Sequence, residues 1–218
     1  MKLIFFITYV LWISPVVLSQ EIWSKIHETH FDEIVINGDG LDDLIIKNSK
    51  DKFIRILLRT ERKGEYSIIT KSLQDQEVFY FQVKKDTYRF NNKKVFRKYI
   101  TNRISNTSAI IEIPKDKSVV VNGKNIGVNS YSYIGNLHIA IHRGNIYLNT
   151  VEGFYKVDFF QGNLYVNNSE FRKELYSNKG IIMFEGERVN SLFKKQIEEK
   201  ERQLFVNSVL GNIFVNGI

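Results

Sequence analysis

Cysteine is absent from the 218-residue sequence, and proline, methionine and tryptophan occur only twice each. Without cysteine there is no disulfide framework, no thiolate metal site and no cysteine nucleophile. The sequence also lacks Gly-x-Ser-x-Gly, Walker and dinucleotide-binding motifs, which removes the signatures of several large enzyme classes. No apolar stripe of useful length recurs at helical spacing. Stability must therefore come from packing and backbone pairing.

Apolar residues make up 43% of the sequence, which is ample for a core and argues against global disorder. A chain of this length forms one sizeable domain or two small ones. Short alternating runs rich in Ile, Val, Phe and Tyr, separated by polar turns, predict strands. These runs lie at 31–37, 44–47, 53–59, 66–70, 78–83, 88–90, 95–99 and 109–113. The sequence therefore predicts an all-β protein.

The first nineteen residues predict a secretory signal peptide. Lys2 gives a positive start, Leu3–Ile13 is almost wholly apolar, Pro15 breaks it, and Ser19 precedes the expected cleavage site. The apolar stretch is much shorter than the roughly 20 residues that span a bilayer, although a retained anchor is the alternative. We expect an exported chain without a lipid anchor or transmembrane segment, located in the periplasm, on the outer cell surface or secreted.

Glycine recurs every nine residues at Gly135, Gly144, Gly153 and Gly162, and Gly180 follows two steps later. The third and fifth positions of each unit are apolar, which indicates one short strand with one buried face. These positions hold Leu137, Ile139, Ile146, Leu148, Tyr155, Val157, Leu164, Val166, Ile182 and Phe184, and an earlier unit gives Val119 and Val121. Glycine and asparagine suit the corners because they tolerate left-handed backbone conformations.

The finer period is eighteen residues. The sequence Gly-Asn-Ile-Tyr-Leu-Asn at 144–149 recurs as Gly-Asn-Leu-Tyr-Val-Asn at 162–167, is recognisable from Gly180 and recurs as Gly-Asn-Ile-Phe-Val-Asn at 211–216. We infer that two units form one coil of a β-solenoid, with like strands stacked about 4.8 Å apart. The 31 residues from Gly180 to Gly211 exceed one coil by 13, so an insertion is expected there. We place it in the charged stretch near 196–203, with an amphipathic helix over Leu192–Arg202 as the alternative.

Asparagine marks two compositional halves, because residues 101–218 hold 16 of the 20 asparagines. We therefore predict a signal peptide at 1–19 and an irregular β region at 20–115 that is continuous with the solenoid. Residues 116–218 are predicted to form the regular β-solenoid with its charged loop insertion.

Four features together resemble the adhesin-like families of bacterial envelope proteins, the DUF4097-like and head GIN domain groups. They are the signal peptide, the opening Thr29–Asn37, the step from strand to corner at Ile111–Lys115, and the Gly-Asn-Ile-Tyr-Leu-Asn repeats. The resemblance covers most of residues 29–218. It implies a β-helical fold and an extracytoplasmic setting, and no established reaction. The charged insertion and the unit at Phe171, which lacks its glycine, depart from the family pattern.

The four histidines form two close pairs, His27 with His30 and His138 with His142. The first pair could ligate a metal on a helix, but its segment precedes a strand. The second pair falls at outward or corner positions of a strand, and a zinc site needs about three protein ligands with supporting partners. Residues 37–43 are rich in oxygen ligands but lack the glutamate that closes a calcium loop, so a turn is favoured. We expect no metal site and no cofactor.

Carboxylate pairs bear on function because parallel β-helices also host enzymes that cleave polysaccharides. The candidates within the repeat are Asp158, Glu174 and Glu185. Glycoside hydrolysis uses two carboxyl groups roughly 5 to 9.5 Å apart, and no acid pair aligns in neighbouring coils. We therefore expect no enzyme, with a polysaccharide-active enzyme on a short β-helix as the alternative.

Two outward ladders are predicted at the fourth and sixth positions of like units. The first reads Tyr147, Tyr165 and Met183, and the second reads Asn149, Asn167 and Glu185, with Phe214 and Asn216 as extensions. Aromatic rings beside amides suit sugar rings or another protein surface. The alternative is that tyrosine simply suits strands and the asparagines form internal hydrogen bonds.

Positive charge is concentrated between residues 84 and 103. The basic residues are Lys84, Lys85, Arg89, Lys93, Lys94, Arg97, Lys98 and Arg103, against one acid, Asp86. Loss of Lys2 with the signal leaves the chain at +6, so this segment at +7 accounts for the whole excess. With its interleaved aromatics it could bind a polyanion, although a solvated strand face gives the same pattern.

The sequence thus predicts a non-enzymatic, extracytoplasmic, adhesin-like binding or structural module of the bacterial cell envelope. The expected partners are a surface glycan, an acidic polymer or another envelope protein, without specific recognition of nucleic acid.

Overall fold

The computed structural model describes residues 21–60, 66–83, 107–167, 170–197 and 202–216, which form nineteen strands and no helix. No helix in this part of the chain is long and apolar enough to cross a membrane. The strands are β1 (Glu21–Glu28), β2 (Glu33–Asn37), β3 (Asp43–Asn48), β4 (Phe53–Thr60), β5 (Tyr66–Leu73), β6 (Gln76–Val83), β7 (Ser108–Ile113), β8 (Ser118–Asn125), β9 (Gly127–Tyr131), β10 (Asn136–Arg143), β11 (Ile146–Leu148), β12 (Phe154–Gln161), β13 (Asn163–Val166), β14 (Arg172–Ser177), β15 (Ile182–Phe184), β16 (Glu187–Val189), β17 (Leu192–Lys195), β18 (Gln203–Ser208) and β19 (Asn212–Val215).

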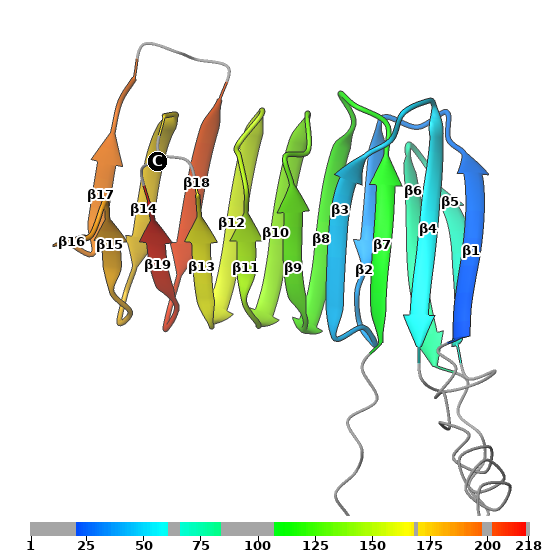
Figure 1. Cartoon of the computed structure of the whole chain (residues 1–218), viewed down its shortest axis with the longest axis horizontal. Coiled ribbons are helices and arrows are strands. Elements are labelled where there is room, and N and C mark those ends of the chain that lie inside the picture. Colours follow the sequence, from blue (N-terminus) through cyan, green and yellow to red (C-terminus); the bar gives the residue numbers. More distant parts are fainter. Residues whose placement is uncertain (1–20, 61–65, 84–106, 168–169, 198–201, 217–218) are drawn as a thin grey trace, which may run out of the picture.

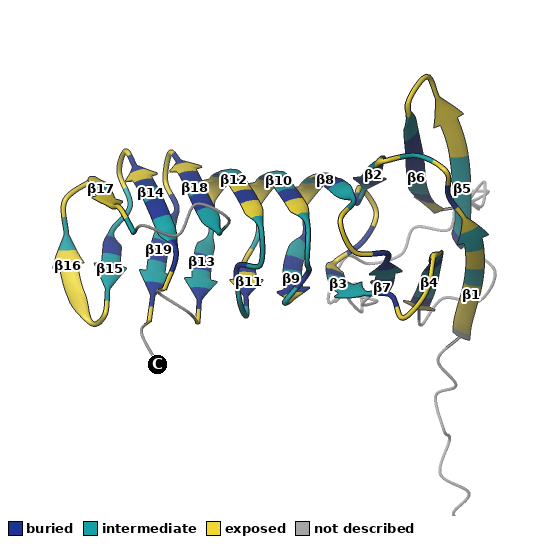
Figure 2. Ribbon diagram, turned by 90° about the horizontal axis from the view of Figure 1, so that it is seen from above, coloured by how far each residue is buried: buried dark blue, intermediate teal, exposed yellow. Residues whose placement is uncertain are grey.

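The strands form two mixed sheets that face each other along the length of the molecule (Figures 1 and 2). Sheet A has the order β1-β4-β7-β3-β9-β11-β13-β19-β15-β16, and sheet B has the order β17-β14-β18-β12-β10-β8-β2-β6-β5. The predicted all-β class is confirmed. Each predicted run within the described residues is a strand, whereas the runs at 88–90 and 95–99 lie outside them.

From β8 to β13 the chain alternates between the two sheets, and each of β8, β9, β10 and β11 pairs in parallel with the strand eighteen residues further on. Leu137 on β10 lies opposite Tyr155 on β12, and Tyr147 on β11 lies opposite Tyr165 on β13. The eighteen-residue period of the sequence is therefore the register of the pairing.

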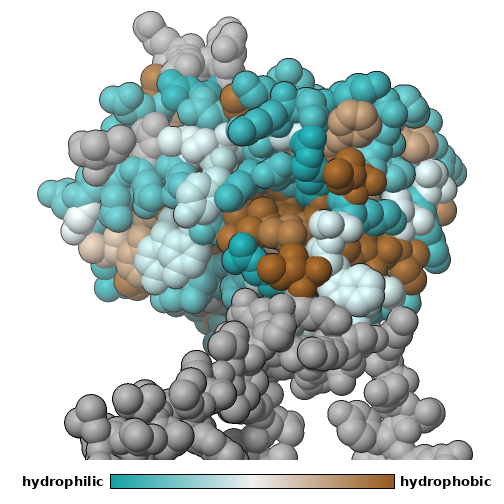
Figure 3. Space-filling view, turned by 45° about the vertical axis from the view of Figure 1, so that its right-hand side comes forward, coloured by the Kyte–Doolittle hydropathy of each residue, from teal (hydrophilic) through white to brown (hydrophobic). Residues whose placement is uncertain are grey.

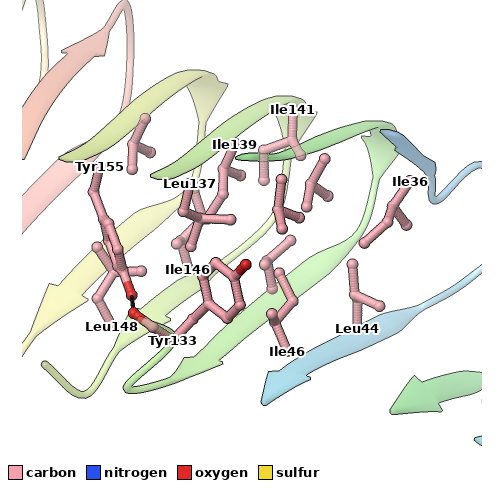
Figure 4. Close-up of a cluster of buried hydrophobic side chains, with 14 of the residues drawn as sticks. Ile36, Leu44, Ile46, Tyr133, Leu137, Ile139, Ile141, Ile146, Leu148 and Tyr155 are labelled. Atoms are coloured by element: carbon pink, nitrogen blue, oxygen red, sulfur yellow. Dashed lines mark hydrogen bonds between the residues drawn. The ribbon is translucent and has the colours of Figure 1, made fainter. Parts of the chain in front are cut away.

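The core lies between the sheets and is built from the third and fifth positions of the repeat. The side chains from Val119 to Val166 at these positions are at most 1% exposed, and those drawn in Figure 4 point towards the opposite sheet. Two tyrosines add polar links inside this core. The hydroxyl of Tyr155 donates to the carbonyl of Tyr133 at 2.5 Å, and the hydroxyl of Tyr133 donates to the carbonyls of Pro114 and Lys117, each at 3.0 Å.

The corner glycines are required by close approach as well as by conformation. A Cβ atom on Gly162 would lie 1.8 Å from the carbonyl oxygen of Gly144, directly below it in the stack. Gly162 also has φ +136°, a region that other residues rarely adopt. The prediction from backbone conformation is confirmed at Gly135, Gly144 and Gly162, but Gly153 does not have this conformation. A Cβ atom on Gly153 would lie 2.2 Å from the carbonyl oxygen of Gly135, so close stacking of the corners is the reason for glycine there.

The order of the last strands corrects the expected stacking. The unit at Gly180 was expected directly beside the unit at Gly162, but Leu164 lies opposite Ile213 instead. Ile182 lies on the far side of Ile213. The final pair, β18 and β19, therefore inserts between β12–β13 and β14–β15. The 31-residue step from Gly180 to Gly211 correctly predicted that the last units depart from the eighteen-residue spacing. A sequence repeat specifies which strands are alike, but it does not specify which strands are neighbours.

The insertion also differs from its expected form. A helix over Leu192–Arg202 was the alternative, and it is wrong where the structure describes that stretch, because Leu192–Lys195 is strand β17. Strands β16 and β17 pair antiparallel with β15 and β14, so the extra residues begin earlier than 196, and Gln203 already belongs to β18. Residues 198–201 lie outside the described residues.

Antiparallel strands cover both ends of the stack. At one end β4 pairs with β7, β5 pairs with β6, and β1 pairs with β4. At the other end β16 pairs with β15, and β17 pairs with β14. A bare parallel edge would present unpaired backbone groups to other chains, and these strands occupy it.

Candidate functional site

One row of side chains runs across the outer face of sheet A in continuous register. From β4 it passes through β7, β3, β9, β11, β13 and β19 to β15. Its members are Leu57, Ile110, Ile45, Asn129, Tyr147, Tyr165, Phe214 and Met183. They face outward because each lies between two buried neighbours on its own strand, except Met183, which has one, Ile182. The sequence identified only the second half of this row, since the first half lies outside the regular repeat.

The aromatic half of the row is a stacked column. The ring centroids of Tyr147 and Tyr165 are 4.9 Å apart with planes 10° from parallel, and those of Tyr165 and Phe214 are 5.1 Å apart at 12°. The predicted ladder is thus present with one change, because Phe214 takes the third place and Met183 moves to the fourth. Since each ring covers the next, the free ring face is that of Tyr147 at the β9 side.

Asparagines form two ladders beside the column. Asn167 donates from Nδ2 to Oδ1 of Asn149 at 3.2 Å, which joins the two predicted residues. A second ladder was not predicted from the sequence. In it Asn212 donates from Nδ2 to Oδ1 of Asn163 at 3.0 Å. Its signal in the sequence is the asparagine that follows Gly162 and Gly211. These bonds satisfy amide groups internally, as the alternative interpretation expected.

A groove of about 550 Å³ lies on the same face where the aromatic column ends. Its walls come from β3, β7, β9 and β11, together with Asn145. Asp43 contributes a carboxylate whose pKa is raised by burial and, to a smaller extent, by the charge of Asp42. In the view that brings the β1 end of the molecule forward, hydrophobic side chains gather in one area (Figure 3).

The basic residues at 84–103 that were predicted to bind an acidic partner lie outside the described residues. The predicted role of Lys84, Lys93, Arg103 and the other basic residues of this segment therefore stays a prediction.

The histidines do not come together. His27 Nε2 lies 2.5 Å from Oε1 of Glu77, while His138 Nε2 lies 2.9 Å from Oδ2 of Asp158. His142 stacks on Phe160 with centroids 4.7 Å apart. Among the described residues no group of three or more histidine or acidic side chains could hold a metal ion.

The oxygen-rich segment at 37–43 is a turn that joins neighbouring strands. Asn37 Oδ1 accepts from the backbone N–H of Asp39 at 3.0 Å, and Asp39 accepts from the N–H of Lys124 at 2.9 Å. Asp42 accepts from the N–H of Thr107 at 2.7 Å. The oxygens are thus used by the backbone, in agreement with the favoured interpretation.

Of the three candidate acids, Asp158 and Glu174 lie on sheet B, whereas Glu185 lies between β15 and β16 of sheet A, 4.0 Å from Lys195 Nζ. Asp158 on β12 and Glu174 on β14 have β18 between them, which separates them by roughly 10 Å or more. Asp158 also lies 3.3 Å from Lys156 Nζ, and Glu174 lies 2.7 Å from Lys194 Nζ. Each carboxylate therefore faces a cation, and the two do not form the close pair that glycoside hydrolysis uses.

The fold is similar to that in the crystal structure of a "putative cell adhesion protein" from Clostridium sporogenes, with TM-score 0.62, 12% identity and coverage of 92% of this chain and 100% of that one. At this identity the likeness shows the fold alone. Two crystal structures of a "putative adhesin" are much less similar to this chain. One is from Bacteroides fragilis (TM-score 0.33, 9% identity, coverage of 90% of this chain and 98% of that one), and the other is from Parabacteroides merdae (TM-score 0.24, 11% identity, coverage of 91% and 96%).

No protein-family model matches the sequence, and no curated protein matches it either. The DUF4097-like and head GIN assignment therefore stays a prediction.

Proposed function

We propose that this protein is a non-enzymatic, extracytoplasmic, adhesin-like module of the bacterial cell envelope, built as a β-solenoid, that binds a surface glycan or another envelope protein through the outer face of sheet A. The observation that carries the proposal is the stacked column of Tyr147, Tyr165 and Phe214 on that face, flanked by asparagine ladders. Rings held rigid at fixed spacing bind a partner at low entropic cost.

Three further observations support the proposal. The eighteen-residue register and the alternation of strands between the sheets are typical of solenoids. The fold matches a "putative cell adhesion protein" over that protein's full length. The apolar segment before residue 20 favours export.

The other candidates gain less support. A polysaccharide-active enzyme lacks an aligned acid pair, since β18 separates Asp158 from Glu174. A polyanion binder rests on the charge of residues 84–103 alone.

The test is retention of the purified, fluorescently labelled protein on isolated bacterial envelopes. We expect the triple variant Tyr147→Ser, Tyr165→Ser, Phe214→Ser to be retained at least about fivefold less than the wild type, because it loses the aromatic face without touching the core. The matched control is Phe154→Ser, Tyr176→Ser, Phe205→Ser, which removes three aromatic rings from the outer face of sheet B.

Retention of the control variant at the wild-type level supports the proposal. Equal loss in both variants, or no retention of the wild type on any envelope preparation, would contradict it. Far-UV circular dichroism of each variant checks that the strands remain folded.

A further inference from the structure

The aromatic column stops one strand short of a second apolar group, and the place between them holds a small polar residue. Tyr147 stacks on Tyr165 with one ring face, so its other face is turned towards β9. The residue opposite on β9 is Asn129, and the next in the row is Ile45 on β3. A groove of about 550 Å³ occupies this place, and its walls include these three residues.

Gly127 and the carboxylate of Asp43 lie against each other in the lining of the groove. A Cβ atom on Gly127 would lie 2.4 Å from Oδ1 of Asp43, so the absence of a side chain at 127 makes room for that carboxylate. Gly127 is held in place because its N–H donates to the carbonyl of Asp42 at 2.8 Å. Asp43, Ser108, Asn129 and Asn145 bring polar side chains into the groove, beside the apolar side chains of Leu44, Ile45 and Val128.

One of these polar groups lacks a partner. The Oδ1 atom of Asn129 is buried and accepts no hydrogen bond from any residue that the structure describes. Leaving a buried acceptor unsatisfied is costly, and the cost is recovered when a bound group donates to it. Asn129 also lines the groove, so its amide is the group that a bound hydroxyl would meet there.

We propose that this groove binds a neutral hexopyranose ring of a glycan, stacked on Tyr147 and hydrogen-bonded to Asn129 and Asp43. The inference rests on the proposed function and names its ligand class. A pyranose has an apolar face for the tyrosine ring and hydroxyl donors for the amide and carboxylate oxygens. An aromatic side chain would stack equally well but leave Asn129 unsatisfied, and an acidic sugar would face Asp43 and Asp42 at close range.

The volume agrees with this occupant, since small-molecule sites span roughly 300 to 1,000 Å³. The groove continues the direction of the aromatic column. A sugar ring stacked on Tyr147 would therefore lie over β9, where Asn129 stands in the row in place of an aromatic residue.

The experiment is a titration of the purified protein, followed by amide NMR, with the methyl glycosides of glucose, galactose, mannose and N-acetylglucosamine. About 10 mM of each suffices for a site with a dissociation constant of about 1 mM. We expect at least one glycoside to shift resonances of β9, β11 and β3, and methyl glucuronide to bind more weakly than its neutral counterpart.

Two variants locate the site. Asn129→Leu keeps nearly the same side-chain shape but removes the amide, and it should weaken binding at least about tenfold because the sugar hydroxyl loses its polar partner. Tyr147→Ala removes the stacking face and should weaken it about fivefold or more. Tyr176→Ala, an equally exposed tyrosine on sheet B, is the control and should bind like the wild type.

Unchanged binding to Asn129→Leu would overturn the inference. Absence of any glycoside binding, while the protein is still retained on envelopes, would overturn it and leave the proposed function standing. Absence of both would contradict the two together.

Discussion

Gly162 shows how tightly the corners of this fold are stacked. Its hydrogen atom points at the carbonyl of Gly144, where a methyl group would come within 1.8 Å of the oxygen. Backbone atoms cannot move aside as the end of a side chain can, so the corner itself must shift.

We predict that Gly162→Ala lowers the free energy of unfolding by at least about 2 kcal/mol, from overpacking together with strain at positive φ. Urea denaturation measures this change. Gly186→Ala is the control, since Gly186 also has positive φ, +85°, but a Cβ atom there meets no atom within 4 Å. An equal loss of stability in both variants would show that close approach to the Gly144 carbonyl does not destabilise Gly162→Ala.

Tyr133 and Tyr155 make the core sensitive to alkali. Burial raises the pKa of Tyr155 to about 12 and raises that of Tyr133 further, from an ordinary value of 10.0. The unfolded chain therefore loses these protons first. Stability from the two phenols is complete below about pH 10 and is lost as the pH rises through 10 to 12.

We predict that the free energy of unfolding falls between pH 10 and 12 by about 1.4 kcal/mol per pH unit for each of these tyrosines. Tyr155→Phe should be less stable at pH 8, because it loses the bond to the Tyr133 carbonyl, but should show a shallower alkaline loss. Urea midpoints measured from pH 8 to 12 test this. A slope that is the same in Tyr155→Phe and the wild type would refute the assignment.

At the residue scale the sequence predicts the regular part of the site well. Tyr147, Tyr165, Asn149 and Asn167 are in the predicted register, because each repeats at the fixed interval that the pairing uses. Asn129 is missed because its strand lacks the Gly-Asn-Ile-Tyr pattern. Asp43 and Ile45 are distant in sequence and reach the groove only through the pairing of β3 with β9.

At the scale of elements, the strand order departs from the chain order at both ends of the stack. The pair β2–β3 lies between β6–β7 and β8–β9, and the pair β18–β19 lies between β12–β13 and β14–β15. Sequence similarity between units cannot specify this, because each inserted unit offers equivalent pairing groups to either neighbour.

Engineered disulfides test the order directly, since the protein has no native cysteine. Tyr165→Cys with Phe214→Cys should form a disulfide on mild oxidation, because adjacent strands place their Cα atoms about 4.8 Å apart. Tyr165→Cys with Met183→Cys should not, because the two strands lie roughly 10 Å apart with β19 between them.

Mass spectrometry under non-reducing conditions distinguishes the two pairs. A disulfide in the Tyr165 and Met183 pair, without one in the Tyr165 and Phe214 pair, would restore simple chain-order stacking and overturn the inserted arrangement.

At the scale of the whole molecule, the two outer faces differ in chemistry. Sheet A presents the row from Leu57 to Met183, which is apolar or aromatic except at Asn129. Sheet B presents ion pairs, His138 with Asp158 and Lys194 with Glu174, interspersed with aromatic side chains such as Phe154 and Tyr176. Surface apolar and aromatic side chains in a continuous row mark interaction sites more often than paired charges do. The continuity of the row on sheet A is therefore the reason for proposing sheet A as the binding face.

The most direct test of this account is hydrogen–deuterium exchange of the purified protein with and without bacterial surface polysaccharide. We predict slower exchange in β9, β11, β13 and β19, with no change in β8, β10 and β12 on the opposite sheet. Protection confined to sheet B, or exchange that the polysaccharide leaves unchanged throughout, would contradict the claim that the aromatic face of sheet A is the binding surface.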